Sequence, residues 1–113
     1  MRQSDSLIVN LILKRGGEIY SAQKRFGADP SILSLDSAYF NAIAMDLLQI
    51  SLAALKFTPE FRSERKKTAW EQIDSWSATI VDRYETLTAL DLWAALEDFA
   101  ELYGECFTLA NSR

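Results

Sequence analysis

Apolar residues recur at helical spacing through most of this chain, and this pattern constrains its fold more than any other feature. The clearest stripe follows the i, i+4, i+7, i+11, i+14 series and consists of Ile43, Leu47, Ile50, Ala54 and Phe57. Alternation of apolar and polar residues, which is typical of strands, never continues beyond a few positions. Only four Gly and two Pro interrupt the 113 residues. We therefore predict an all-α fold, with residues 1–113 forming a single domain: an up-down bundle of four main helices plus one short helix.

Polar residues and a glycine mark the expected ends of the first two helices. The first helix is expected over residues 6–26, with Ser4 or Asp5 accepting a hydrogen bond from its first amide groups. Gly27 accepts a left-handed conformation and so ends this helix. A loop then leads to the second helix, expected over residues 36–57, whose inner face is the stripe described above.

The second half of the chain predicts one short and two long helices. Thr58 precedes a proline, the usual order of a cap and a first helical residue, so the short helix is expected there. The third helix is expected over residues 69–84. The fourth begins after Thr88, and Asp91 takes the place that Glu has in a capping box. The apolar stripe of the fourth helix consists of Leu92, Leu96, Phe99, Tyr103 and Phe107.

Composition argues against several functional classes. The chain has no histidine and only one cysteine, Cys106, so neither an internal disulfide nor a cysteine-based zinc site can form. The acidic residues of the fourth helix lack the Glu-x-x-His spacing of a di-metal bundle; they are Glu97, Asp98, Glu101 and Glu105. We expect no metal and no cofactor. No apolar run reaches the roughly 18 residues that span a bilayer, and no signal-peptide pattern is present, so a cytoplasmic protein without membrane contact is expected.

The net charge of −4 disfavours general nucleic-acid binding, but the charge is unevenly distributed. Basic residues gather before the third helix, at Arg62, Arg65, Lys66 and Lys67. Such a cluster can contact nucleic-acid phosphates or an acidic partner surface. It can equally be a solvated connection between helices, because Glu60 and Glu64 dilute its charge and few aromatic side chains stand among the cations.

Six short pieces of the chain occur in the order and spacing of one known family: Phe26-Gly27, Asp36-Ser37-Ala38-Tyr39, Gln49-Ile50, Thr58-Pro59-Glu60-Phe61-Arg62, Trp70-Glu71-Gln72-Ile73, and Tyr84 nine residues before Trp93. On these pieces the chain resembles the HepT-like branch of the HEPN superfamily, over about residues 12–96. The resemblance implies a small helical protein that forms a homodimer. Active members of the family are RNases that serve as toxins of toxin–antitoxin pairs, and their partner is a small nucleotidyltransferase of the MNT type.

The catalytic motif of that family is not intact in this chain. Its pattern is Arg, four residues, His, one residue, Tyr, and the flanking matches put these positions at Ser77, Asp82 and Tyr84. Metal-free RNA cleavage needs a group of near-neutral pKa and a fixed positive charge on the phosphate. Ser77 supplies neither, and Asp82 repels the phosphate. The family also tends to have Gly-Glu where this chain has Ser51-Leu52, which removes one more polar residue.

The resemblance therefore predicts a catalytically degenerate HepT-like protein that acts by binding. An antitoxin-type or regulatory component of a toxin–antitoxin system is expected, forming a homodimer through its third helix and pairing with the nucleotidyltransferase. Tyr84 matches a tyrosine that the partner enzyme modifies with AMP groups in active members; otherwise it is an ordinary tyrosine at a helix end. Trp76, Ser77 and Arg83 are candidates for a cleft or partner contact, although Trp76 can also join the apolar stripe.

Two further functions stay open at this stage. The first is a weak metal-independent RNase that uses Arg83 with Tyr84 in place of the missing residues. The second is a structural homodimeric adaptor, for which the acidic surface of the fourth helix is the docking surface.

Overall fold

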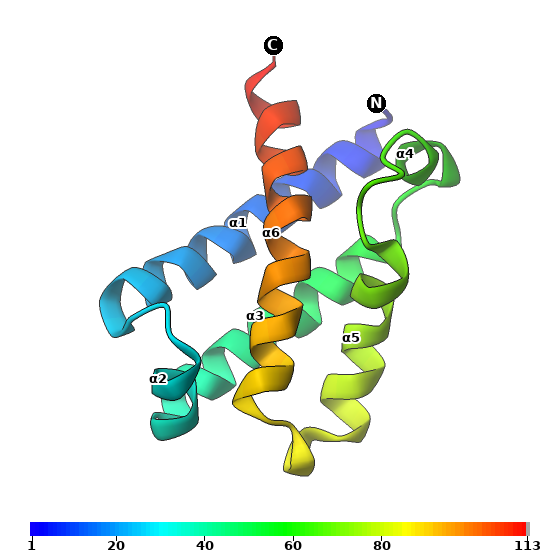
Figure 1. The fold of residues 1–113 in the computed structure, drawn as a ribbon. Coiled ribbons are helices and arrows are strands. Elements are labelled where there is room, and N and C mark those ends of the chain that lie inside the picture. Colours follow the sequence, from blue (N-terminus) through cyan, green and yellow to red (C-terminus); the bar gives the residue numbers. More distant parts are fainter. Residues whose placement is uncertain (113) are drawn as a thin grey trace.

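A computed structural model describes residues 1–112, and no strand occurs in this part of the chain (Figure 1). Four long helices carry the fold, and two short helices and one 3-10 turn connect them. The elements are α1 (Gln3–Phe26), α2 (Pro30–Leu35), α3 (Ser37–Ala54), α4 (Pro59–Ser63), α5 (Trp70–Asp82), η1 (Tyr84–Thr86) and α6 (Ala89–Asn111). The predicted all-α fold with four long helices is confirmed, with one short helix more than expected.

Helix α3 lies in the middle of the molecule. It packs along α1 on one side and along α5 on the other, and α6 crosses in front of α1 and α3 (Figure 1). The shortest dimension of the molecule is 20 Å, which corresponds to two layers of helices of about 10 Å each. One layer therefore holds α1, α3 and α5, and α6 covers only one of its two faces.

The predicted inner stripe of α3 forms the centre of the core. Its five residues, Ile43, Leu47, Ile50, Ala54 and Phe57, are all buried. They meet Ile12 and Ile19 of α1, Ile73 of α5 and Phe99 of α6 in one continuous hydrophobic cluster. The stripe of α6 is confirmed only in part, because Phe107 is 54% exposed near the end of that helix.

The start of α1 differs from the expectation. The helix begins at Gln3, and neither Ser4 nor Asp5 caps it. Asp5 is buried inside the first turn, where its carboxylate accepts hydrogen bonds from the Thr58 amide and hydroxyl at 2.9 and 2.7 Å. The hydrogen-bonding capacity of Asp5 is thus used to tie α1 to the start of α4 rather than to cap its own helix.

The expected loop between the first two helices contains α2. Asp29 caps this helix by accepting a hydrogen bond from the Ser31 amide, and Pro30 is its first residue. Asp36 then ends α2 and caps α3 with a bond from the Tyr39 amide. A single turn of helix with one buried residue, Leu33, gives too short a periodic signal to be predicted.

For the remaining helices, the predicted caps are confirmed, whereas two of the predicted end residues are wrong. Thr58 caps α4, and Thr88 with Asp91 forms a complete capping box at α6. Gly27 has the expected positive φ, at 110°. The third helix, however, stops at Asp82, and α3 stops at Ala54, three residues before the predicted end.

Candidate interaction surface

Ser77, one of the candidate residues from the sequence, is held inside the fold by its backbone. The hydroxyl of Ser51, a buried residue of α3, donates to the Ile73 carbonyl at 2.6 Å and accepts from the Ser77 amide at 3.1 Å. These two backbone groups of α5 are four residues apart, the pair that an α-helix normally joins directly. The Ser77 hydroxyl itself bonds the Asp74 carbonyl of its own helix. Ser77 thus anchors α5 to α3, with no side-chain charge to offer a substrate.

Asp82, Arg83 and Tyr84 lie at the end of α5, where the chain turns toward α6. All three residues are exposed. Asp82 is the last residue of α5, and Tyr84 opens the 3-10 turn η1. The Tyr84 hydroxyl donates a hydrogen bond to the side-chain oxygen of Asn41 on α3. Tyr84 follows the end of α5, close to the helix end predicted from the sequence. Its hydrogen bond to Asn41, which is 43 positions away in the sequence, was not predicted.

Arg62 and Arg65, two of the four residues in the basic cluster, have their guanidinium groups engaged within the chain. Arg62 forms two 2.7 Å hydrogen bonds to the Asp74 carboxylate and a third to the Ala54 carbonyl. Its guanidinium lies 4.6 Å from the centre of the Trp70 ring. Arg65 stacks on Phe61 at 3.9 Å and donates to the Phe61 carbonyl.

Arg62 therefore holds α4 against α3 and α5, whereas the Arg65 side chain packs on α4 itself. Within the predicted cluster only Lys66 and Lys67 are exposed, and two lysines give a weak electrostatic site for nucleic acid.

The three tryptophans serve the fold. Trp76 is buried with 6% exposure and belongs to the core, which is the first of the two places that the sequence offered for it. Trp70 and Trp93 are half-buried against the same core. The Trp70 ring nitrogen donates to the Arg65 carbonyl at 3.1 Å.

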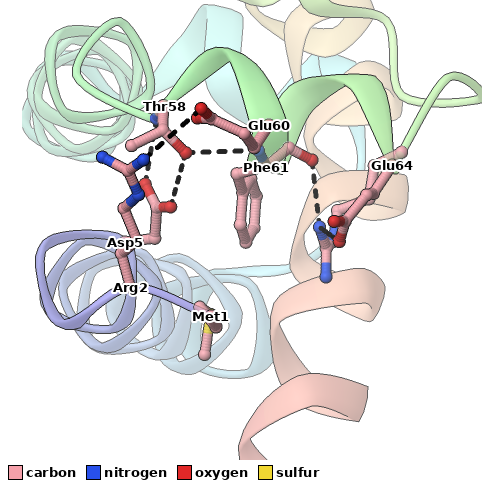
Figure 2. Close-up of a pocket in the computed structure, with 8 residues that line it drawn as sticks. Met1, Arg2, Asp5, Thr58, Glu60, Phe61 and Glu64 are labelled. Atoms are coloured by element: carbon pink, nitrogen blue, oxygen red, sulfur yellow. Dashed lines mark hydrogen bonds and ion pairs between the residues drawn. The ribbon is translucent and has the colours of Figure 1, made fainter.

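A pocket of about 350 Å³ lies between the N-terminal turn of α1 and α4. Figure 2 shows the Asp5 carboxylate turned toward Thr58, and Arg2 reaching Glu60. Both Asp5 oxygens already accept hydrogen bonds from Thr58. The Arg2–Glu60 pair, at 3.5 Å, is exposed. Asp5 with Thr58 and Arg2 with Glu60 thus form two pairs across the pocket, which joins α1 to α4.

The most distinctive surface is the side of α3 that faces away from the core, which we call the outer stripe: Asn41, Met45, Leu48, Leu52 and Leu55. These residues have the same i, i+4, i+7, i+11, i+14 spacing as the inner stripe. Met45, Leu52 and Leu55 are each about half exposed. Because α3 is apolar on both sides, and helices of that kind are normally covered all round, this exposure marks an interaction surface.

Shallow grooves run along both sides of the outer stripe. On the α1 side, a groove of about 360 Å³ lies between Leu7, Leu11 and Leu52. On the α5 side, another of about 360 Å³ is lined by Asn41, Met45, Leu48, Ile80, Val81 and Tyr84. Val81, near the end of α5, is 62% exposed and belongs to this groove. We call the outer stripe with both grooves the outer face.

A small group of charged residues joins α1 to α3. The Arg15 guanidinium is 3.3 Å from the Glu18 carboxylate and 4.0 Å from that of Asp46. Burial, together with the neighbouring Glu18, raises the pKa of Asp46 to about 7, while Arg15 opposes this change. The charges of this group are thus directed toward one another.

Within residues 1–112, no group of acidic, Cys or His side chains is placed to hold a metal ion. Over the same residues, no helix has both the length and the apolar character needed to cross a bilayer. Comparison with protein-family models, curated proteins and solved structures finds no match in any of the three. The family resemblance therefore rests on the sequence pieces named above.

Proposed function

We propose that this chain is a catalytically inactive HepT-like protein that acts by binding, as an antitoxin-type or regulatory component of a toxin–antitoxin system in the cytoplasm. Its expected partners are a second copy of itself and a nucleotidyltransferase of the MNT type. The observation that carries the proposal is the state of the motif positions. Ser77 has its backbone amide and its hydroxyl bonded within the α3–α5 pair, and Asp82 adds a negative charge at the helix end.

The surroundings of the motif support the same proposal. Arg62 and Arg65, which could have supplied positive charge, are committed to Asp74, to backbone carbonyls and to aromatic rings. Arg83 is exposed at the end of α5 and has no histidine to work with. An oxygen-rich, cation-poor site cannot stabilise the charge that develops on a phosphate during cleavage. An exposed apolar face, by contrast, is what a binding protein requires.

The test for catalysis is incubation of the pure chain with tRNA and with mRNA, without added metal. We expect no cleavage above a buffer control. Cleavage that disappears in Arg83→Ala or Tyr84→Phe, while persisting in the exposed-site control Lys67→Ala, would establish the weak RNase instead.

The test for binding is a pull-down from native lysate, followed by mass spectrometry. We expect a small nucleotidyltransferase among the retained proteins, encoded beside this chain. Retention of a different assembly through the acidic residues of α6 would favour the structural adaptor and would contradict the toxin–antitoxin role.

A further inference from the structure

We propose that a second copy of this chain covers the outer face and thereby encloses Tyr84, so that the dimer hides this tyrosine and the monomer exposes it. The inference deepens the proposed binding role by assigning the surface, the occupant and a consequence for one residue. It moves the expected dimer contact from the third predicted helix, α5, to α3, with the α5 end as its border.

The outer face is long and wide enough for a helix of a second copy to lie on it. The outer stripe extends from Asn41 to Leu55, or about 21 Å at 1.5 Å rise per residue. Grooves of about 360 Å³ on its α1 side and on its α5 side widen the face beyond a single helix.

The charge of the outer face favours a neutral partner. No residue of the outer stripe is charged, and Lys56 is the only ionisable residue of the groove between α1 and α3. The nearby Arg15 is already occupied by Glu18 and Asp46. Nucleic acid needs a row of cations to neutralise its phosphates, so it does not fit this face. A second, equally neutral copy does.

The arrangement of the stripe favours self-association around a two-fold axis. In such a dimer the same patch serves both subunits, so the middle of the patch meets its own copy. Leu48 is the middle residue of the five, with two stripe residues on each side. Asn41, the one polar residue of the stripe, is already hydrogen bonded to Tyr84 and needs no partner from outside.

Tyr84 lies within the covered area. Its ring lines the same groove as Met45 and Leu48, and its hydroxyl is fixed to Asn41 of the stripe. In one chain Tyr84 is 44% exposed, close to the 39% of Tyr20. Tyr20 instead packs on Phe99 and Tyr103 of α6, in the other layer. The two tyrosines therefore form a matched pair, and only one of them loses its exposure in the proposed dimer.

The experiment is tyrosine nitration by tetranitromethane, followed site by site with mass spectrometry. The wild type is compared with Leu52→Lys, which places a charge in the outer stripe at a half-exposed position, and with Leu90→Lys, a control at a more exposed leucine of α6. Burial and Tyr103 raise the pKa of Tyr20, so each tyrosine is compared with itself between variants.

The expected result is selective protection of Tyr84. At a total concentration about ten times the dissociation constant, roughly one fifth of the chains are monomeric, so nitration of Tyr84 should be about fivefold slower in the wild type than in Leu52→Lys. Tyr20 should react equally in all three proteins, and Leu90→Lys should behave as the wild type. Equal nitration of Tyr84 in wild type and Leu52→Lys would overturn the proposal.

A second variant tests the position of the axis and does not depend on Tyr84. Leu48→Cys should form a disulfide-linked dimer on mild oxidation, whereas Leu90→Cys should not. The native Cys106 does not interfere, because burial shields it and raises the pKa of its thiol to about 12. Failure of Leu48→Cys to cross-link would overturn the proposed dimer contact centred on Leu48. It would leave the inactive-RNase proposal intact, because that proposal is tested on RNA alone.

Discussion

The two sides of α3 carry the same kind of pattern but lie in opposite surroundings. The inner stripe and the outer stripe share one spacing, and both are largely apolar. Leu47 of the inner stripe is fully buried, whereas Leu52 of the outer stripe is 48% exposed. Helices α1, α5 and α6 cover the inner stripe in the folded chain. The outer stripe is not covered in this way. The inner stripe therefore contributes to the stability of the fold, and the outer stripe is available for association with another molecule.

The largest effect is expected from matched alanine substitutions on the two sides. Leu47→Ala should lower the free energy of unfolding by about 2–5 kcal/mol, because it opens a cavity in the core. Leu52→Ala should change it by no more than about 0.5 kcal/mol in dilute, monomeric protein. Urea unfolding at low protein concentration measures both. Equal losses of unfolding free energy in the two variants would show that the outer stripe belongs to the core, and would contradict the proposed difference between the two sides.

A smaller effect is expected at Ser51, on the side of α3 that faces α5. Ser51→Ala removes a hydroxyl that bonds both the Ile73 carbonyl and the Ser77 amide. The loss should be about 1–2 kcal/mol, because the Ile73 carbonyl and the Ser77 amide each lose a hydrogen-bond partner inside the fold. Ser75→Ala, at an exposed serine of α5, serves as the control and should have little effect in the same urea titration. A neutral Ser51→Ala would mean that the hydroxyl contributes nothing to docking α5.

The smallest effect is expected at Asp46, on the side of α3 that faces α1, and it depends on pH. Because the folded chain raises the pKa of Asp46 from 3.8 to about 7, it binds a proton more tightly than the unfolded chain does. Stability associated with this group is therefore present at low pH and is lost as the pH rises toward and through 7. Asp46→Asn removes the ionised carboxylate, so it should gain on the order of 1 kcal/mol relative to wild type at pH 8 compared with pH 5.

Thermal unfolding of Asp46→Asn at the two pH values measures this difference. Glu18→Gln is the matched variant, because Glu18 contributes to the raised pKa of Asp46; it should weaken the pH dependence without abolishing it. A stability difference between Asp46→Asn and wild type that is the same at pH 5 and pH 8 would contradict the assignment.

The sequence predicted those parts of the fold that depend on local chemistry. The inner stripe of α3, the Thr58 cap and the capping box at Thr88 were all identified from residue types and spacing, and all are confirmed. Asp5 was assigned wrongly because its side chain bonds a residue 53 positions away, which no local rule can anticipate. The same holds for Arg62, whose charge appeared free until the fold brought Asp74 to it.

The candidate surface was the least predictable feature. Periodicity identifies an apolar stripe but not which of two stripes on one helix receives the other helices of the chain. The outer stripe has only one polar residue, Asn41, so the sequence offered no contrast between a buried and an exposed side. Only the position of α6, which covers one face of the α1–α3–α5 layer, distinguishes the two (Figure 1).

The most direct test of the central claim, that the outer face of α3 is covered by a second copy, is the mass of the wild-type chain by light scattering across a dilution series. We predict twice the mass of one chain at the highest concentrations, falling toward one chain on dilution. Leu52→Lys should have the mass of one chain throughout, and Leu90→Lys should follow the wild type. A wild type with the mass of one chain at every concentration, or a Leu52→Lys that dimerises as tightly as the wild type, would contradict the claim.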